Sequence, residues 1–395
     1  MKKAIAILFA ILLVGGTLTA CGSVGAPATD TPATDTPATD TPADTTTPPA
    51  DTTAGSPEIF LISDSGSIDD RSFNQASWEG ITRFGDENNI AYQVIQPTTS
   101  DTTAFLDNIQ IAVNGGAKII VVSGFLFEEA VFIAQDQYPD VKFILIDGAP
   151  NDANPDFAQR VFKTGDNTVG VSFAEQQAGF LAGYAAVMEG KTELGFMGGM
   201  AVPPVVRFGY GFLQGAEYAA SKLGLAPDSI NIKYHYTGTF QAGPDIVTAA
   251  AGWFSQGTEV IFACGGAIGN SIMQAAEQNN GLVIGVDVDQ SSQSQTVITS
   301  AMKEISNAVY DLLNDFYFGT FPGGQNVVFD ATNDGVGLPL AADSWRFTTF
   351  TKDQYNEIFQ QLHDGDITVL GDGDATLDTL VADLGLTIVT VQVIN

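Results

Sequence analysis

The sequence predicts an α/β protein with two doubly wound lobes, each built on a parallel sheet, and a ligand cleft between them. The first observation is that, from residue 58 onward, short β-rich segments alternate with longer amphipathic ones, which is typical of βαβ units. The second is a weak internal repeat that relates the two halves of this region. The third is an N-terminal stretch whose composition is unsuited to any core.

The expected strands are short runs rich in Val, Ile, Leu and Phe. They are residues 59–62, 118–122, 142–146, 193–197, 230–236, 260–263 and 283–286. The expected helices carry apolar residues at helical spacing. They are residues 72–88, 102–113, 127–138, 170–188, 208–223, 244–255, 267–279 and 300–318. We expect a two-lobe domain over residues 58–395, with a first lobe at about 58–165 plus returning segments and a second at about 170–300.

The internal repeat pairs residues of the two expected lobes. Glu58 and Phe73 are matched by Glu193 and Phe208, both with an offset of 135 residues. Open α/β sheets bind ligands at the carboxyl ends of their strands. We therefore expect the two phenylalanine rings on opposite walls of the cleft, where they could sandwich a flat ligand, although core packing is the alternative. Two further pairs of segments keep nearly the same offset, namely 115–120 with 256–261 and 143–147 with 283–287.

The first twenty residues are typical of a bacterial signal peptide. Lys2 and Lys3 precede the uncharged apolar run 4–14, which is too short to span a bilayer permanently. The following Leu-Thr-Ala-Cys sequence ends at Cys21 and resembles the lipobox of bacterial lipoproteins. We therefore expect the Cys21 thiol to carry the acyl chain and to become the first residue of a lipoprotein anchored on the extracytoplasmic face of the cell membrane.

Residues 21–57 are expected to tether the domain to that lipid anchor. Residues 22–57 contain seven prolines and no aromatic residue, Lys, Arg or Glu, and Ala-Thr-Asp-Thr-Pro occurs three times in succession within them. Such a segment cannot bury enough apolar area to offset the loss of chain entropy on folding. Proline favours extended structure of about 3 Å per residue, so the tether reaches at most about 100 Å.

Composition restricts the partners and cofactors that we expect. The chain has 46 acidic and 15 basic residues, and its formal charge of −31 disfavours a nucleic-acid partner. It has only two cysteines and two histidines, so we expect no metal site, no cofactor and no disulfide scaffold. The adjacent carboxylates of Asp69 and Asp70 could form a catalytic pair, but capping of the following helix explains them more simply.

Residues 64–75, with Trp78-Glu79-Gly80 behind them, form the most distinctive segment of the chain. This segment resembles its counterpart in the basic membrane protein family, the purine-nucleoside-receptor-like solute-binding lipoproteins of bacterial ABC transporters. The resemblance extends over nearly everything from residue 58 to about 369. Its other motifs are residues 175–185, 195–200 with Arg207-Phe208 and Gly211-Phe212, Cys264-Gly265-Gly266, and 284–290 with 299–303.

The resemblance implies a two-lobe fold of the type I periplasmic-binding-protein kind and a receptor without enzymatic activity. Such a receptor would capture a purine nucleoside outside the cell and deliver it to ABC permease subunits. A ligand-dependent sensor with the same clamp, a secreted nucleoside-processing enzyme, and a binding protein for another small aromatic or sugar ligand are the alternatives.

The resemblance also implies roles for particular residues. Phe73 and Phe208 would stack on the two faces of the purine, a contact worth roughly 1–3 kcal/mol per base. Asp147 is a further candidate because the repeat matches it with Asp287, although capping of the next turn is its alternative. Asp289 is an alternative to Asp287 as the ribose acceptor. The remaining assignments are Asp64 and Asn74 at the polar edge of the base, and Gly265 or Gly266, Asp287 and Lys303 at the ribose.

The anchoring assignment is tested by Cys21→Ser, which removes the acylated thiol. We expect the variant to leave the membrane or to stall before signal cleavage, as measured by fractionation and by the mass of the N-terminal peptide. Deletion of residues 22–56 is the matched control, because it should leave ligand affinity unchanged. A Cys21→Ser protein that stays in the detergent-extractable membrane at the wild-type level would contradict the lipoprotein assignment.

Overall fold

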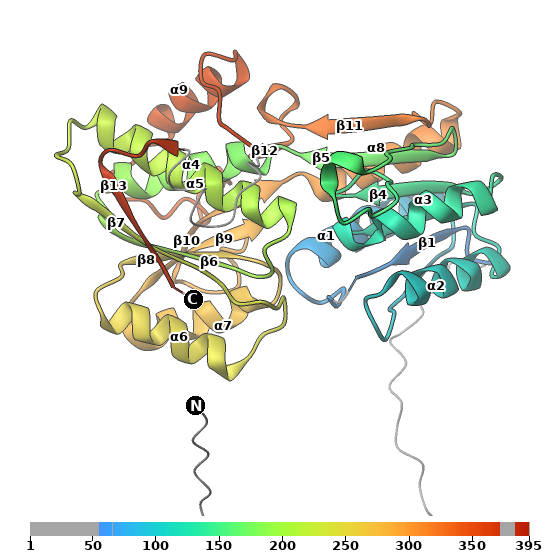
Figure 1. Ribbon diagram of the computed structural model, residues 1–395, viewed down its shortest axis with the longest axis horizontal. Helices are drawn as coiled ribbons and strands as arrows, with labels where there is room; N and C mark the ends of the chain where they lie inside the picture. The colour runs from blue at the N-terminus through green and yellow to red at the C-terminus, as the bar shows by residue number, and fades with distance from the viewer. Residues whose placement is uncertain (1–54, 65, 372–383, 395) are drawn as a thin grey trace, which may run out of the picture. The chain divides into compact units, whose positions relative to one another are not determined.

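The computed structural model describes residues 55–64, 66–371 and 384–394, and these form two α/β lobes (Figure 1). The predicted signal peptide, Cys21 and all but the last three residues of the predicted tether lie outside the described residues. Within the described ranges, no helix is both long enough and apolar enough to cross a bilayer.

The first lobe is built on a parallel sheet with the strand order β11-β5-β4-β3-β1-β2. One face packs against α1 (Phe73–Asn88) and α8 (Ile305–Phe318), and the other against α2 (Thr102–Asn114) and α3 (Glu128–Gln137). Between β3 and α3 lies the short helix η1 (Phe125–Phe127), and η2 (Phe157–Gln159) precedes β5. The strands are β1 (Ile59–Ile62), β2 (Tyr92–Ile95), β3 (Ile119–Ser123), β4 (Lys142–Ile146), β5 (Thr168–Phe173) and β11 (Gln325–Phe329).

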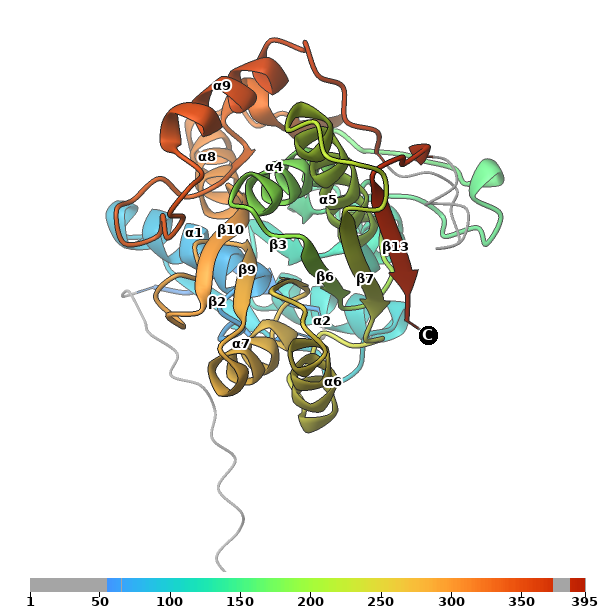
Figure 2. The ribbon, with the colours of Figure 1, turned by 90° about the vertical axis from the view of Figure 1, so that its left-hand side faces the viewer.

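The second lobe is built on a sheet with the order β12-β10-β9-β8-β6-β7-β13, in which only β12 runs antiparallel to its neighbour among the described strands. Figure 2 shows α4 (Glu175–Met188) and α5 (Pro203–Lys222) on one face and α6 (Pro244–Ser255) and α7 (Ile268–Asn279) on the other. The helix α9 (Lys352–His363) packs beside α4, and η3 (Ala331–Asn333) lies between β11 and β12. The strands are β6 (Glu193–Gly198), β7 (Ile230–Tyr236), β8 (Val260–Cys264), β9 (Leu282–Asp287), β10 (Val297–Lys303), β12 (Val336–Gly337) and β13 (Val389–Val393).

The two lobes repeat one topology, as the sequence predicts. The order β2-β1-β3-β4-β5 in the first sheet is matched by β7-β6-β8-β9-β10 in the second. Helix α1 follows β1 as α5 follows β6, and the two begin with or near Phe73 and Phe208. The carboxyl ends of equivalent strands therefore carry equivalent positions, and this is the edge at which such sheets bind ligands.

The connections between the lobes exchange two helices. Helix α4 follows β5 of the first sheet but packs against α5 in the second lobe, whereas α8 follows β10 of the second sheet but packs against α1 in the first. The chain then crosses again between β11 and β12. Because β5 belongs to the first sheet, the first pass of the chain through the first lobe ends at Phe173, whereas the sequence analysis expected it to end near residue 165.

Three of the expected helices were wrong at their starts. The helix expected at 208–223 begins five residues earlier, at Pro203, and the other two begin later than expected. Residues 170–173 and 300–303 are the ends of strands β5 and β10, and each strand is separated from the next helix by one residue, Ala174 or Glu304. With no Gly or Pro between strand and helix, the sequence carries no turn signal there. The strands that the sequence analysis missed are β2, β5, β10, β11, β12 and β13, and the α-helix that it missed is α9.

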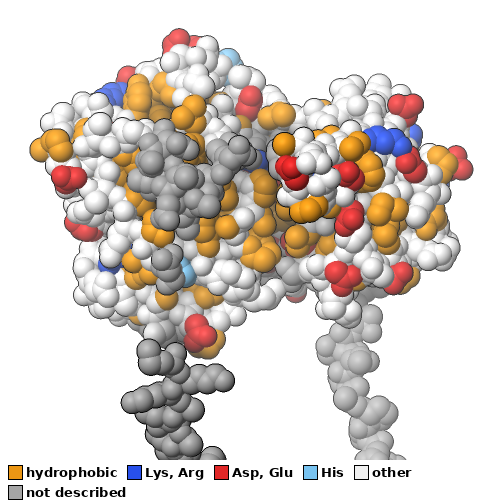
Figure 3. Space-filling view, viewed as in Figure 1, with side chains coloured by type: hydrophobic (Ala, Val, Ile, Leu, Met, Phe, Trp, Pro, Cys, Tyr) orange, Lys and Arg blue, Asp and Glu red, His pale blue; other side chains and the backbone are white. Residues whose placement is uncertain are grey.

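The surface is acidic without a concentrated charge patch on the face seen in Figure 3. Asp and Glu side chains are scattered over both lobes in that view, and Lys and Arg are few. This distribution is typical of a solvated surface, which keeps a protein of strongly negative net charge soluble.

Helices α4 and α5 approach each other unusually closely because glycines lie at their contact. A Cβ atom added at Gly183 would lie 2.1 Å from the Phe212 carbonyl oxygen, and one at Gly215 would lie 1.9 Å from that of Phe180. Neither backbone oxygen can rotate away. The contact thus requires the absence of a side chain at both positions.

We predict that Gly183→Ala lowers the free energy of unfolding by about 1–3 kcal/mol, the usual cost of overpacking a core. The matched control is Gly252→Ala in α6, where nothing lies within 4 Å of the added Cβ. This control should be roughly 0.5–1 kcal/mol more stable than the wild type, because Ala favours a helix over Gly. Chemical denaturation measures both values. Equal effects of the two substitutions would contradict the packing described here.

Candidate functional site

A cavity lies between the carboxyl ends of the two sheets. It encloses about 900 Å³, including the solvent at its mouth, and it takes its walls from both lobes. The structure brings together every ligand-binding residue that the sequence analysis named, except Asp289, the alternative to Asp287. These are Asp64, Phe73, Asn74 and Asp147 from the first lobe and Phe208, Gly265, Gly266, Asp287 and Lys303 from the second.

The loop between β1 and α1 forms a polar wall organised around Asp70. The Asp70 carboxylate accepts hydrogen bonds from the backbone N–H groups of Ser72 (2.8 Å), Asn74 (2.9 Å) and Gln75 (3.1 Å), so it caps α1 as the sequence analysis preferred. Burial raises the pKa of Asp70 to about 6, although these donors oppose the rise. The carboxylate is thus used to hold the loop.

Asn74 has a fixed orientation in this wall. Its Nδ2 donates to Asp64 Oδ1 at 3.0 Å and to Asp70 Oδ2 at 3.1 Å, and because both partners are carboxylates the nitrogen must point toward them. Asn74 Oδ1 is buried and has no hydrogen-bond partner among the described residues. Burial raises the pKa of the Asp64 carboxyl above its usual range. Hydrogen-bond acceptors of Asn74 and Asp64 are therefore available at this end of the cavity.

Phe73 and Phe208 contribute aromatic surface from opposite lobes. Phe73 is the first residue of α1 and is partly buried, whereas Phe208 lies in the second turn of α5 and is 2 % exposed. The Phe208 ring also packs edge-on against Phe262 at 5.8 Å between centroids. Phe208 therefore borders both the cavity and the core. The two roles considered in the sequence analysis, a wall of the cleft and packing in the core, each describe it in part.

Asp147 and Asp287 occupy equivalent positions in the two lobes. Asp147 directly follows β4, Asp287 is the last residue of β9, and both have a left-handed backbone conformation. Their φ angles are +61° and +65°, a conformation that is unusual for residues other than Gly, Asn and Asp. The equivalent positions after β3 and β8 are Gly124 and Gly265, with φ angles of +115° and +154°. A Cβ at Gly265 would lie 2.8 Å from the backbone nitrogen of Gly199, so only glycine fits there.

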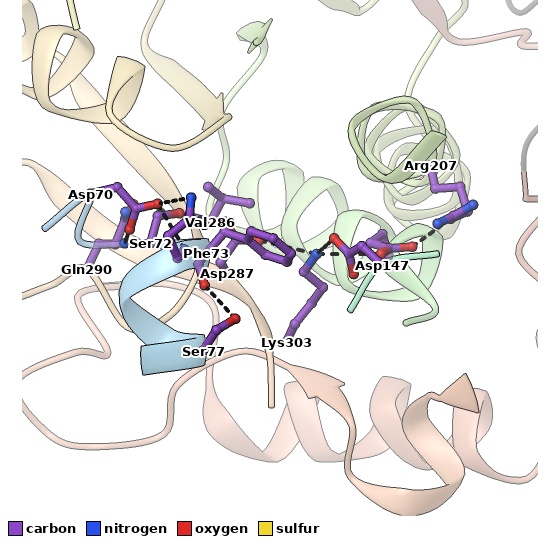
Figure 4. A network of polar contacts seen from close by, with 12 residues as sticks. Asp70, Ser72, Phe73, Ser77, Asp147, Arg207, Val286, Asp287, Gln290 and Lys303 are labelled. Carbon is purple, nitrogen blue, oxygen red and sulfur yellow. Dashed lines mark hydrogen bonds and ion pairs between the residues drawn. The ribbon is translucent and has the colours of Figure 1, made fainter. Parts of the chain in front are cut away.

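Lys303, the last residue of β10, is the centre of a buried ionic cluster (Figure 4). Its Nζ lies 2.6 Å from Asp147 Oδ2 in the opposite lobe, 3.5 Å from Asp287 Oδ1 and 3.6 Å from Glu175 Oε1. The second oxygen of Glu175 accepts a hydrogen bond from Arg207 Nε at 2.6 Å. Lys303 Nζ also lies 4.8 Å from the centroid of the Phe73 ring.

The cluster contains more carboxylates than cations. Burial raises the pKa of Asp147 to about 7; Lys303 opposes this rise, while the negative charges of Glu175 and Asp287 add to it. Burial alone would lower the pKa of the Lys303 ammonium, but the three carboxylates raise it above its usual value. Lys303 is therefore charged at any physiological pH, and Asp147 exchanges a proton near neutrality.

The structure separates the two candidate ribose acceptors. Asp287 borders the cavity, and its Oδ2 accepts a hydrogen bond from Ser72 Oγ at 2.5 Å. Asp289 is not among the residues that border the cavity. Its carboxylate accepts hydrogen bonds from the hydroxyl of Ser344 and from the backbone N–H of Ser291 at 3.0 Å. Asp289 thus organises the loop after β9.

Several cavity or cluster residues were not assigned a role from the sequence. Glu175 and Arg207 lie in recognised motifs, and their opposite charges are a signal that could have suggested a pair. Ser72 could not have been linked to Asp287, since 215 residues separate them. The apolar walls also include Phe125, Leu126, Val202, Pro204, Val205 and Phe240. Among the described residues, no group of His, Cys, Asp and Glu is arranged to hold a metal ion.

The chain is similar to known proteins over most of its length. A family model described as "ABC transporter substrate-binding protein PnrA-like" matches residues 59–365. The "ABC transporter nucleoside-binding protein BmpA" of Lactococcus lactis is 29% identical over 332 residues, which are 78% of this chain and 88% of the relative. The "Basic membrane protein A2" of Borrelia garinii is 30% identical over 294 residues, covering 72% and 80% of the two chains.

Solved structures share the fold. The ABC transporter solute-binding protein of Aeropyrum pernix superposes with a TM-score of 0.71 and 23% identity, over 83% of this chain and 97% of that one. The corresponding protein of Conexibacter woesei gives 0.61 and 22% identity, over 80% and 99%. At these identities the likeness establishes the two-lobe fold alone.

The pH dependence of stability should identify the proton on Asp147. Because its folded pKa of about 7 exceeds the unfolded value near 3.9, its stabilising contribution is complete below about pH 4 and is lost as the pH rises to about 7. We predict that, between pH 5 and 8, the ligand-free wild type loses unfolding free energy relative to Asp147→Asn.

Asparagine is the matched substitution, since it keeps the shape of the side chain and tolerates the left-handed backbone. Denaturant titrations at each pH give the difference between the two proteins, which cancels the contribution of Asp70. Parallel pH profiles would mean that Asp147 does not titrate in this range.

Proposed function

Because the chain belongs to the PnrA-like family of ABC transporter substrate-binding proteins, we propose that it captures purine nucleosides outside the cell and delivers them to an ABC permease. The proposal includes a lipid anchor on Cys21, which would hold the domain at the membrane surface. The observation that carries it is the convergence of nine predicted residues from both lobes on one cavity. The name of the Lactococcus lactis relative, a nucleoside-binding protein, supports the same ligand class.

The aromatic walls suit the flat part of a nucleoside. Phe73 and Phe208 border the cavity from opposite lobes. A purine between them would contact one ring on each face when the lobes are closed. Stacking depends on the π-face that all bases share, and therefore supplies affinity with little discrimination. Discrimination must come from the polar ends of the cavity.

The cluster around Lys303 suits the ribose. Asp147 Oδ1 is buried and has no hydrogen-bond partner among the described residues, while Asp287 Oδ1 is 3.5 Å from the ammonium. Vicinal hydroxyls could donate to these carboxylates, and Lys303 could donate to a hydroxyl oxygen. The deprotonated cluster would reject a ligand that lacks those donors, because its carboxylates would remain desolvated and unpaired.

The wall formed by Asn74 and Asp64 suits a base edge that carries N–H donors. Since Asn74 Nδ2 is fully used, the amide offers its Oδ1 as an acceptor. Inosine and guanosine have an N1–H group at the Watson–Crick edge, whereas purine riboside has no donor on its base. We therefore place the Watson–Crick edge against this wall.

Four ligands test the proposal in isothermal titration: inosine, 2′,3′-dideoxyinosine, hypoxanthine and purine riboside. We predict that inosine binds more than tenfold tighter than each of the other three, equivalent to more than about 1.4 kcal/mol. Dideoxyinosine and hypoxanthine lose the ribose donors, and purine riboside loses the base donor. Equal affinity for hypoxanthine and inosine would contradict ribose recognition by Asp287 and Lys303.

Two variants separate the parts of the site in the same titrations. Asp287→Asn keeps the left-handed backbone and should narrow the gap between inosine and dideoxyinosine. Phe73→Ala should weaken all four ligands by roughly 1–3 kcal/mol. Phe73→Leu is the matched control, because it keeps most of the apolar area but removes the aromatic ring that stacks. The ligand-free unfolding curves of the variants must stay cooperative if Phe73 belongs to the site and not to the core.

A further inference from the structure

The loop between β9 and β10, residues 288–296, is polar and contains two glutamines that reach the opposite lobe. Gln290 Nε2 and Gln293 Nε2 each donate a hydrogen bond of 2.9 Å to the same acceptor, the backbone carbonyl oxygen of Arg71. Arg71 lies in the loop between β1 and α1 of the first lobe, so both hydrogen bonds cross between the lobes. Neither glutamine borders the cavity.

Gln290 is held rigidly by its own lobe. It is 1 % exposed, its Oε1 accepts a hydrogen bond from the backbone N–H of Val286 at 3.1 Å, and its own N–H donates to Ser300 Oγ at 3.0 Å. The loop is fixed from behind by Arg346, whose guanidinium donates to the carbonyl oxygens of Ser291, Ser294 and Val297. The donor that faces Arg71 is therefore preorganised.

Gln293 makes its side-chain hydrogen bond only across the lobes, as far as the described residues show. Its Oε1 is buried and has no hydrogen-bond partner there. The hydrogen bond to the Arg71 carbonyl is therefore the polar contact through which this side chain acts between the lobes. Such a side chain stabilises the closed arrangement of the lobes and contributes little to the fold of its own lobe.

Arg71, whose carbonyl oxygen is the acceptor, belongs to the loop between β1 and α1 that borders the cavity. Arg71 has a left-handed φ of +57°, and it precedes Ser72, which donates to Asp287 across the lobes, and Phe73, whose ring borders the cavity. Two consecutive residues of the first lobe, Arg71 and Ser72, thus form hydrogen bonds with the second. Holding the Arg71 carbonyl fixes the backbone that carries the Phe73 ring.

We propose that Gln290 and Gln293 form a closure latch, which grips the Arg71 carbonyl when the lobes close and sets how long a bound ligand is retained. Both are positioning residues, since they act through Arg71 and Phe73 and not on the ligand. The latch would form in any closed molecule, with or without ligand. Affinity then depends on the latch through the population of the closed state.

Gln293→Ala tests the latch, because it removes a cross-lobe donor from a partly buried loop position. Gln295→Ala is the matched control, being the same substitution at an exposed site two residues away that makes no hydrogen bond among the described residues. Gln293→Glu is a second variant, which places a carboxylate against the Arg71 carbonyl and should act more strongly. Denaturation of each ligand-free variant checks its fold.

The first measurement is the distance between the lobes without ligand. Spin labels at Gln110→Cys in α2 and Ala249→Cys in α6, both exposed, report on the side of the molecule away from β11 and β12, seen in Figure 1. The full chain carries Cys21→Ser, so that the labels attach only at the engineered positions, Cys264 being buried. We expect longer distances in Gln293→Ala and Gln293→Glu than in Gln295→Ala.

The second measurement is the dissociation rate of inosine, and it rests on the proposed function. We expect Gln293→Ala to release inosine about two- to tenfold faster, the effect of one neutral hydrogen bond, with a nearly unchanged association rate. Distances and rates equal to those of Gln295→Ala would overturn the latch. If the wild type bound no inosine, the nucleoside proposal would fail, while the distances would still decide the latch.

Discussion

The charge of Lys303 must be neutralised inside the protein, because its side chain is only 2 % exposed between the two lobes. A buried ammonium without partners is strongly destabilising, and removing one partner of a buried ion pair typically costs about 3–5 kcal/mol. The partners come from the end of β4, the start of α4 and the end of β9. Only the closed arrangement assembles all of them around one nitrogen. Closure therefore adds the carboxylate of Asp147 from the first lobe to the two that the second lobe itself supplies.

Several other features of the site follow from this constraint. The left-handed backbone at Asp147 and Asp287 turns both carboxylates toward the ammonium, at a cost in backbone strain that the ion pairs offset. Arg207 neutralises the second oxygen of Glu175, so that this fully buried carboxylate has a cation on each side. A ligand that adds hydroxyl donors would satisfy the oxygen that remains unpaired on Asp147.

The predictability of the fold depended on burial. Strands 59–62 and 142–146 were located to the residue, because central strands of a parallel sheet are continuous apolar runs. Strands β11 and β13 were missed since their side chains alternate with solvent and their place is set by pairing to β5 and β7. The candidate site residues were named mainly from the family resemblance, and the internal repeat added the Phe73–Phe208 and Asp147–Asp287 pairs. Ser72 and Gln293 could not be named in this way, because only the tertiary structure brings them to Asp287 and Arg71.

The exchange of α4 and α8 between the lobes has a consequence for the origin of the fold. Duplication of one half, followed by fusion of a domain-swapped homodimer, would produce this reciprocal arrangement and a pseudo-two-fold axis through the cavity. The last residues of β5 and β10 break that symmetry, for one is Phe173 and the other Lys303. An ancestral symmetric pocket could accept a ligand either way round. In this cavity Lys303 is a wall residue and Phe173 is not, so the two orientations of an asymmetric ligand would meet different groups.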